Sequence, residues 1–158
     1  MDTQTSSTTK QTNPKPADVV VRGNTDGFLQ QIVAGAHRFS ADEPVSAGGG
    51  NLAPDPYDYL LAGLGACTSM MVGLHARQNR LPLENINVSL RHSRIHAEDC
   101  AECVTKEGML DRIDIDVELT GSLTQEQHAK LMEVARKCPV HRALTSEINI
   151  RLQSVPST

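Results

Sequence analysis

The chain carries three short strand-like stretches between Val19 and about Ser46, which read VVVRG, FLQQIVAG and HRFSAD. Each is rich in β-branched and apolar residues, and glycines interrupt them at Gly23, Gly27 and Gly35. Short stretches of this composition bounded by glycine are typical of strands joined by tight turns. The pattern therefore predicts an antiparallel meander in this part of the chain.

A long helix is predicted next, from Pro56 to about Asn79, after the connector AGGGNLAPDP, which we expect to be flexible. Its start signal combines Asp55 as N-cap, Pro56 at the first helical position and Asp58 three residues after the cap. The apolar run inside it is shorter than the roughly 20 residues of a bilayer span, which indicates a core helix. The apolar stripe expected to face the core is made of Leu60, Leu64, Cys67, Met71 and Leu74.

Two strands with alternating apolar residues follow Pro82, separated by the polar loop HAEDCAECVTKEGML. The predicted buried face of the first strand starts at Ile86, Val88 and Leu90 and continues through His92, Arg94 and His96. The second strand ends at Gly121, and its buried face consists of Ile113, Ile115, Val117 and Leu119.

A second helix begins at a predicted capping box formed by Thr124 and Gln127. Pro139 fits poorly inside a helix but well in the first turn of a new one, so Cys138 is expected at a helix junction. The apolar stripe of this second helix runs through His128, Leu131, Met132, Ala135 and Cys138. A last strand is predicted through Ile148, Ile150 and Leu152.

The predicted order of three strands, a helix, two strands, a helix and a strand favours an α+β fold over a doubly wound parallel sheet. A chain of 158 residues is long enough to bury one core. We therefore predict a single domain over residues 18–153, with a disordered N-terminal tail at 1–17 and a C-terminal tail at 154–158.

Composition and charge narrow the possible partners. With two Tyr, two Phe and no Trp, the chain lacks aromatic platforms for single-stranded nucleic acid, and a net charge of -4 offers no basic stripe. The polar N-terminus shows no targeting segment, so we expect a cytoplasmic protein without a nucleic-acid or membrane partner. In that reducing compartment, four cysteines are more typical of catalysis, metal binding or inert thiols than of a structural disulfide framework.

Cys67 and Cys138 are the first candidate pair for chemistry. Cys67 lies among small residues in LGACTSM, whereas Cys138 precedes His141 and Arg142 in KCPVHRAL. A thiol at a helix start near cationic side chains has a lowered pKa. If the two apolar stripes pack together, the two sulfurs face each other, as a thiol that is oxidised and then resolved requires. The alternative is that both cysteines act only as small buried hydrophobic residues.

Cys100 and Cys103 form a second pair, C-x-x-C, which follows His92 and His96. All four are zinc-ligand types, although the short spacing between His96 and Cys100 would strain a tetrahedral site. Three interpretations stay open: a zinc site, a redox-active or structural disulfide, and an exposed loop without catalytic chemistry.

Three segments, PDPYDYLLAGLGACTSM, DCAEC and ARKCPVHRAL, strongly resemble the OsmC/Ohr family of osmotically inducible and organic hydroperoxide resistance proteins, most closely its OsmC-like branch. The resemblance extends from about Val19 to Leu152. It implies an intertwined homodimer in which antiparallel sheets wrap around two long central helices, with active sites at the subunit interface.

The resemblance also implies thiol-dependent reduction of organic hydroperoxides in defence against oxidative stress. Cys67 would be the peroxidatic thiolate and Cys138 the resolving thiol. An external dithiol, rather than a bound cofactor, would then restore the pair. The side chains expected to bind the hydroperoxide are Tyr57, Leu60, Leu64, Met70 and Met71.

The family also places an Arg and a Glu beside the nucleophile, and here the chain departs from the pattern. Tyr57 stands where the family has the Glu, and Asp58 is the nearest carboxylate, although it is rotated by about 100° on the helix. Arg22 is the candidate for the Arg, with Arg38 as second choice. The missing Glu leaves a second function open, that of a stress-associated binding protein with little or no peroxidase activity.

Overall fold

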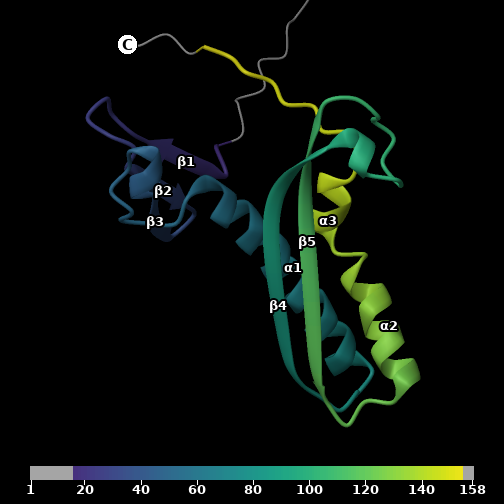
Figure 1. The fold of residues 1–158 in the computed structure, drawn as a ribbon. Coiled ribbons are helices and arrows are strands. Elements are labelled where there is room, and N and C mark those ends of the chain that lie inside the picture. The colour runs from purple at the N-terminus through teal and green to yellow at the C-terminus, as the bar shows by residue number, and fades with distance from the viewer. Residues whose placement is uncertain (1–15, 155–158) are drawn as a thin grey trace, which may run out of the picture. The chain divides into compact units, whose positions relative to one another are not determined.

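The computed structural model describes residues 16–154, and the chain divides after Asp55 into two compact units. Figure 1 shows the order of the elements along the chain. The tails predicted at 1–17 and 154–158 lie outside the described residues, except for residues 16, 17 and 154.

The first unit contains an antiparallel sheet of three strands in the order β1-β2-β3. The strands are β1 (Val19–Arg22), β2 (Gln30–Ala34) and β3 (His37–Ala41). In the tight turn between β2 and β3, Gly35 has φ +60°, a left-handed conformation that glycine adopts without strain. The predicted meander is therefore confirmed.

The connector after β3 is folded around one buried carboxylate, that of Asp42. This carboxylate accepts hydrogen bonds from the backbone N–H groups of Gly50 and Leu52 at 3.0 Å each and of Glu43 at 2.9 Å. The bond from Leu52 has the largest effect, and together the three bonds lower the pKa of Asp42 although burial opposes them. The 3-10 helix η1 (Val45–Ala47) lies inside this loop. The expectation of a flexible connector was therefore wrong for residues 47–52.

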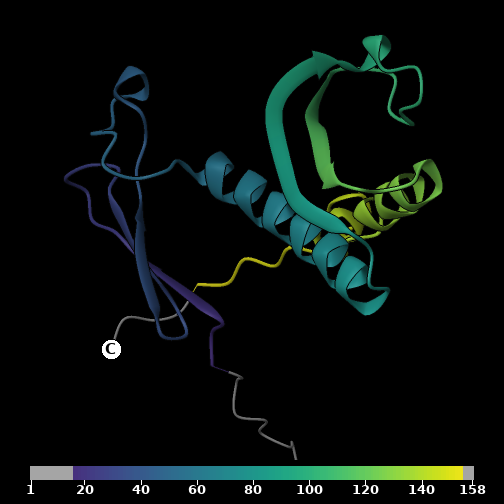
Figure 2. The ribbon, with the colours of Figure 1, turned by 90° about the horizontal axis from the view of Figure 1, so that it is seen from below.

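The second unit is a long β-hairpin packed with helices. Helix α1 (Pro56–Gln78) leads into β4 (Leu83–His96), which pairs antiparallel with β5 (Met109–Gly121). The 3-10 helix η2 (Ala97–Asp99) lies in the connecting loop, and α2 (Gln125–Ala135) and α3 (Pro139–Leu144) follow. Helix α1 contacts β4, α2 and α3. Figure 2 shows that the hairpin of β4 and β5 is strongly curved.

Local start signals set the positions of α2 and α3. The hydroxyl of Thr124 accepts the N–H of Gln127 at 3.2 Å, and the Gln127 side chain accepts the N–H of Thr124 at 2.9 Å. This is the predicted capping box, which satisfies two N–H groups that the helix itself leaves unpaired. Pro139 is the first residue of α3, so the predicted helix junction at Cys138 is also confirmed.

The core of the second unit forms where α1 meets α2. Its buried residues are Val72, Ala76, Leu131 and Ala135. Partly buried side chains from the hairpin and the adjoining loops pack against them, namely Leu81, Leu83, Ile86, Leu119 and Leu123. Because both helices contribute to this core, apolar contacts hold α1 and α2 in a fixed position relative to each other.

The buried side of α1 is rotated by about one residue from the predicted stripe. It runs through Leu64, Thr68, Val72 and Ala76, whereas Leu60 and Leu74 are exposed and Cys67 is half-buried. Among the described residues, one helix, α1, has the length and the apolar composition that a membrane span needs. A helix that is apolar on most sides does not show by its pattern alone which side packs within the chain.

Three further sequence predictions were wrong. Residues 147–153 form no strand, and Ile148, Ile150 and Leu152 are exposed, because no strand lies beside them among the described residues to pair their backbone groups. On β4 the half-buried face reaches His92, but beyond it Arg94 and His96 are exposed. In α2 the stripe begins at Leu131, and His128 is exposed to solvent.

Gly121 ends β5 in a conformation that leaves no room for a side chain. Its φ is +138°, and a Cβ at this position would lie 2.1 Å from the carbonyl oxygen of Pro82. We expect Gly121→Ala to lower the free energy of unfolding by about 1–3 kcal/mol, measured by urea denaturation, because backbone atoms cannot move aside. Gly108→Ala is the matched control, since Gly108 has φ +84° but no atom within 4 Å of the new Cβ. Equal losses in both variants would contradict the steric explanation.

Candidate active site

Cys138 is fully buried at the junction between α2 and α3. It is the N-cap residue of α3, and its Sγ accepts a hydrogen bond from the backbone N–H of His141 at 3.2 Å. The first N–H groups of a helix have no partner within the helix. The sulfur therefore occupies the place that the oxygen of a Ser or Asp cap usually takes.

Thr68 connects α1 to this junction. Its side chain is buried, and its Oγ1 lies 3.5 Å from the Sγ of Cys138 and 2.9 Å from the carbonyl oxygen of Leu64. A hydroxyl has one proton, so it donates to only one of these acceptors at a time. When Cys138 is a thiolate, Thr68 can donate to the sulfur. When Cys138 is a thiol, Thr68 can donate to Leu64 and accept the S–H.

Cys67 precedes Thr68 on α1 and is half-buried. Both Cys67 and Cys138 are free thiols, and the Cys67 side chain lies close enough to the sulfur of Cys138 to lower the pKa of Cys138. The structure thus brings together two thiols that are far apart in the sequence. Two thiols in contact can release two electrons by forming a disulfide.

The surroundings of Cys138 lower the pKa of its thiol from the ordinary value of 9.0. Burial has the largest single effect and raises the pKa, but four hydrogen bonds together outweigh it. The donors are the backbone N–H of His141, the hydroxyl of Thr68, the thiol of Cys67 and the backbone N–H of Val140. Cys138 is therefore a buried sulfur whose anionic form is stabilised, next to a more accessible thiol.

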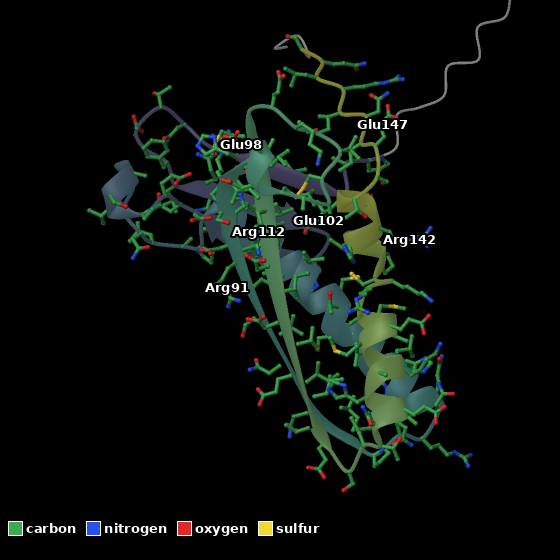
Figure 3. All side chains as sticks on the ribbon, turned by 45° about the vertical axis from the view of Figure 1, so that its right-hand side comes forward. Arg91, Glu98, Glu102, Arg112, Arg142 and Glu147 are labelled. Atoms are coloured by element: carbon green, nitrogen blue, oxygen red, sulfur yellow. A yellow bond between two sulfur atoms is a disulfide. The ribbon has the colours of Figure 1, made fainter. Side chains whose placement is uncertain are left out.

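The cationic side chains after Cys138 do not have the predicted role. His141 acts through its backbone, while its ring Nδ1 lies 2.8 Å from the carbonyl oxygen of Arg136. Arg142 is exposed, and Figure 3 shows its side chain extending outward from α3. The sequence correctly indicated a lowered pKa at a helix start, but hydrogen bonds rather than nearby cations are the cause.

Asp58 is not a neighbour of Cys67 within this chain. It lies in the first turn of α1, about two and a half turns before Cys67 and therefore on the opposite side of the helix. Arg22 and Arg38 belong to the first unit, where they occupy exposed positions in β1 and β3. The structure therefore offers no support for Asp58 as an activating carboxylate in the same subunit.

Tyr57, at the start of α1, packs on a histidine. Its ring stacks on that of His92, with centroids 4.3 Å apart and planes inclined by 14°. The Nε2 of His92 lies 2.9 Å from Oδ1 of Asp111 on the neighbouring strand. The sequence pointed to His92 as part of a strand face and as a possible zinc ligand, but not to its partners, because the pairing of β4 with β5 that brings Asp111 beside it is not visible in the sequence.

Two features of the site were missed or differ from expectation. Thr68 was not singled out, although a lone polar residue on the buried side of an apolar helix is a signal that its hydroxyl has a partner.

The residues expected to bind substrate do not share one environment. Leu64 is buried, Met71 is half-buried, and the exposed members of the set are Tyr57, Leu60 and Met70.

The loop between β4 and β5 contains a disulfide. It joins Cys100 to Cys103, whose Cα atoms are 5.3 Å apart. The described residues contain no group of three or more His, Cys, Asp or Glu side chains that could hold a metal ion. The zinc interpretation of His92, His96, Cys100 and Cys103 was therefore wrong, and the disulfide interpretation fits the structure.

Comparisons with known proteins agree with this fold. Residues 48–153 match the model of the family described as OsmC-like protein. The chain is similar to an OsmC-like protein from Mycoplasma pneumoniae, with 19% identity, 82% of this chain and 87% of that chain covered, and a TM-score of 0.63. A search of curated protein sequences finds no match.

Two other solved structures are similar. One is the organic hydroperoxide resistance protein OsmC from Legionella pneumophila, with 20% identity, 80% and 87% of the two chains covered, and a TM-score of 0.58. The other is an organic hydroperoxide resistance protein of Bacillus subtilis, with 20% identity, 85% and 94% covered, and a TM-score of 0.56. These similarities confirm the predicted α+β fold with antiparallel sheets.

Replacing Thr68 tests the hydrogen bond to Cys138. Thr68→Val removes the hydroxyl with little change in volume, so the pKa of Cys138 should rise and the free energy of unfolding should fall by about 1 kcal/mol. The measurements are thiolate ultraviolet absorbance against pH and urea unfolding. Thr68→Ser keeps the hydroxyl and should stay close to the wild type. An unchanged pKa in Thr68→Val would contradict the role assigned to this hydroxyl.

Proposed function

Because the chain belongs to the OsmC-like family, we propose that it reduces organic hydroperoxides in defence against oxidative stress, with Cys67 and Cys138 as its redox pair. The observation that carries the proposal is the closeness of the two thiols at the contact of α1 with α3, where Thr68, the residue after Cys67, lies 3.5 Å from the Cys138 sulfur and Cys67 helps to lower the pKa of Cys138. Two structural relatives are named for organic hydroperoxide resistance, which supports the same class of substrate.

The first half of the reaction takes place at Cys67, the more accessible thiol. The Cys138 thiolate accepts the proton of the neighbouring Cys67 thiol, which leaves Cys67 as the nucleophile. The Cys67 thiolate attacks the terminal oxygen of the hydroperoxide, and the O–O bond breaks. The alkoxide takes the proton from Cys138 and leaves as an alcohol. Cys67 is then a sulfenic acid and Cys138 is again a thiolate.

The second half of the reaction resolves the sulfenic acid. The Cys138 thiolate attacks the sulfur of Cys67, an S–S bond forms, and hydroxide leaves and is protonated to water. A lowered pKa keeps Cys138 in the form that this step needs. An external dithiol then exchanges with the disulfide and returns two electrons and two protons to the pair, so no bound cofactor takes part.

The exposed surface of α1 supports both an apolar substrate and a homodimer. Tyr57, Leu60, Met70 and Leu74 are large apolar side chains that stay exposed on this helix in the single chain. Several large apolar side chains exposed on one helix are typical of a surface that binds an apolar ligand or another protein. We propose that a second copy covers α1 in the cytoplasm, and that the hydroperoxide chain lies against the same side chains, with Arg22 as the cationic partner.

A second candidate function is that of a stress-associated binding protein with little or no peroxidase activity. Two observations favour it. Asp58 lies on the side of α1 opposite Cys67, and Tyr57, in the place of the family's Glu, is stacked on His92. Both leave the nucleophile without an activating carboxylate from its own helix.

Single cysteine substitutions separate the two functions. We expect Cys67→Ser to reduce turnover of cumene hydroperoxide, with dithiothreitol as the dithiol, to the uncatalysed rate. In the absence of dithiothreitol, Cys138→Ser should consume at most one equivalent of hydroperoxide and then stop with an oxidised Cys67, because no thiol is present to resolve the sulfenic acid. The assay is hydroperoxide consumption, with the oxidised residue identified by mass spectrometry.

The double variant Cys100→Ser/Cys103→Ser is the control for the cysteine substitutions and should keep its turnover. Full activity in Cys67→Ser would contradict the mechanism. A folded wild type that consumes no hydroperoxide would favour the binding function.

Met70 tests the proposed dimer, because it is 71% exposed in the single chain. We expect Met70→Lys to raise the dissociation constant of the dimer at least about tenfold, since an unpaired charge would be buried at the interface. Sedimentation equilibrium measures the change. His128→Lys, at an exposed position on α2, is the control and should leave the dissociation constant unchanged. A monomeric wild type would contradict the proposal.

A further inference from the structure

The disulfide between Cys100 and Cys103 has no part in the proposed peroxidase reaction. It lies in the loop between β4 and β5, whereas the two thiols of that reaction lie on α1 and at the start of α3. Cys67 and Cys138 are free, so the chain holds one reduced pair and one oxidised pair. The oxidised pair needs an explanation of its own.

Closure of this loop does not require the disulfide. The strands β4 and β5 pair as far as His96 opposite Met109, and the N–H of Ala97 then donates to the carbonyl of Gly108 at 2.8 Å. The bonded cysteines are only three positions apart. The stabilisation that a disulfide gives by restricting the unfolded chain is smallest for such short loops. A purely structural role therefore explains little of this bond.

The two cysteines differ in access. Cys100 is buried, whereas Cys103 is half-buried and is followed by the exposed Val104. An external thiolate therefore reaches the sulfur of Cys103 first and displaces that of Cys100. The ammonium group of Lys106 donates to the carbonyl oxygens of Cys100 and Ala101, at 3.3 and 3.1 Å. This positive charge is held at the backbone of the residue whose sulfur is displaced, and a nearby cation favours the thiolate form.

A cavity of about 300 Å³ adjoins the disulfide and is lined by both cysteines. Its lining has one basic residue, Arg112, which pairs with Asp114 at 2.9 Å. The carboxylates that line it are Asp99, Glu102, Asp111 and Asp114. Figure 3 shows Glu98 and Glu102 at the end of the hairpin that carries the disulfide. The cavity is therefore large enough for a small thiol and is negatively charged.

We propose that Cys100 and Cys103 form a second redox site, which exchanges with external small thiols and prefers cationic thiols to anionic ones. A thiolate attacks the sulfur of Cys103, the bond to Cys100 breaks, and Cys100 leaves as a thiolate that takes a proton from water. A second thiolate attacks the external sulfur of the mixed disulfide and releases Cys103. Two thiols are oxidised to one disulfide, and the cysteine pair gains two electrons and two protons.

The charge of the cavity sets the preference among thiols. Carboxylates concentrate a cationic thiol near the bond and exclude an anionic one, and salt screens this effect. Cysteamine, 2-mercaptoethanol and 2-mercaptoethanesulfonate supply a cationic, a neutral and an anionic probe of similar size. Dividing each rate by the rate of the same thiol with a neutral small disulfide removes differences in intrinsic reactivity.

The experiment follows the cysteine pair in the wild-type full chain without hydroperoxide, so its outcome does not depend on peroxidase activity. After timed exposure to each thiol, free cysteines are alkylated, and the tryptic peptide Ile95–Lys106, which holds Cys100 and Cys103 but neither Cys67 nor Cys138, is measured by mass spectrometry. We expect the disulfide to be reduced while the protein stays folded. At low salt, the normalised rate with cysteamine should exceed that with the anionic thiol about tenfold. This preference should approach one at high salt.

Glu102→Gln and Glu98→Gln are matched variants for this test. Glu102 lines the cavity and Glu98, in η2 of the same loop, does not, so only Glu102→Gln should reduce the preference severalfold. The variant Cys100→Ser/Cys103→Ser should unfold within a few degrees of the wild type. The proposal is overturned if the bond is reduced only after unfolding, or if all three thiols react at equal normalised rates. Equal effects of the two Glu variants would also overturn it.

Discussion

The contact between Thr68 and Cys138 joins α1 to the start of α3 and sets the position of the candidate site. It lies where α1 meets α3, beside the apolar core that α1 shares with α2. A polar group buried in such a place is tolerated only if it has a partner. Among the described residues no buried side-chain nitrogen or oxygen lacks one. The candidate site is therefore part of the core rather than a feature added to its surface, and its sulfur chemistry and the packing of three helices are inseparable.

Those parts of the fold that rest on local chemistry could be predicted from the sequence. The capping box at Thr124 and the proline after Cys138 act within one helical turn, so their effect does not depend on the rest of the molecule. The alternating residues of β4 and β5 were equally informative. Two features depended on partners that a sequence pattern does not identify. One is the side of α1 that packs. The other is the stretch through Ile150, which alternates like a strand but has no neighbouring strand to bond within residues 16–154.

The candidate site likewise has features that follow from local signals and features that depend on distant partners. The sequence indicated that Cys67 and Cys138 matter and that a helix start lowers the pKa of Cys138, because helix geometry follows from local signals. It attributed that effect to side-chain cations, whereas backbone N–H groups and Thr68 are responsible. Hydrogen bonds across helices depend on the rotation of α1 about its axis, and the sequence pattern placed that rotation about one residue away. The pairing of His92 with Asp111 could not be predicted from the sequence for a similar reason, because it follows from the register between β4 and β5.

Asp42 gives the two units different responses to acid. The loop after β3 is organised by one ionised carboxylate, which the hydrogen bonds from Leu52, Glu43 and Gly50 keep charged to lower pH than usual. The stability that this carboxylate gives to the loop is fully present above the ordinary pKa of an aspartate, and it is lost as the pH falls through the lowered pKa. The core between α1 and α2 consists of Val, Ala and Leu side chains that do not titrate. Acid strong enough to protonate Asp42 would thus loosen the loop after β3, whereas the core between α1 and α2 has no carboxylate that protonation could disrupt.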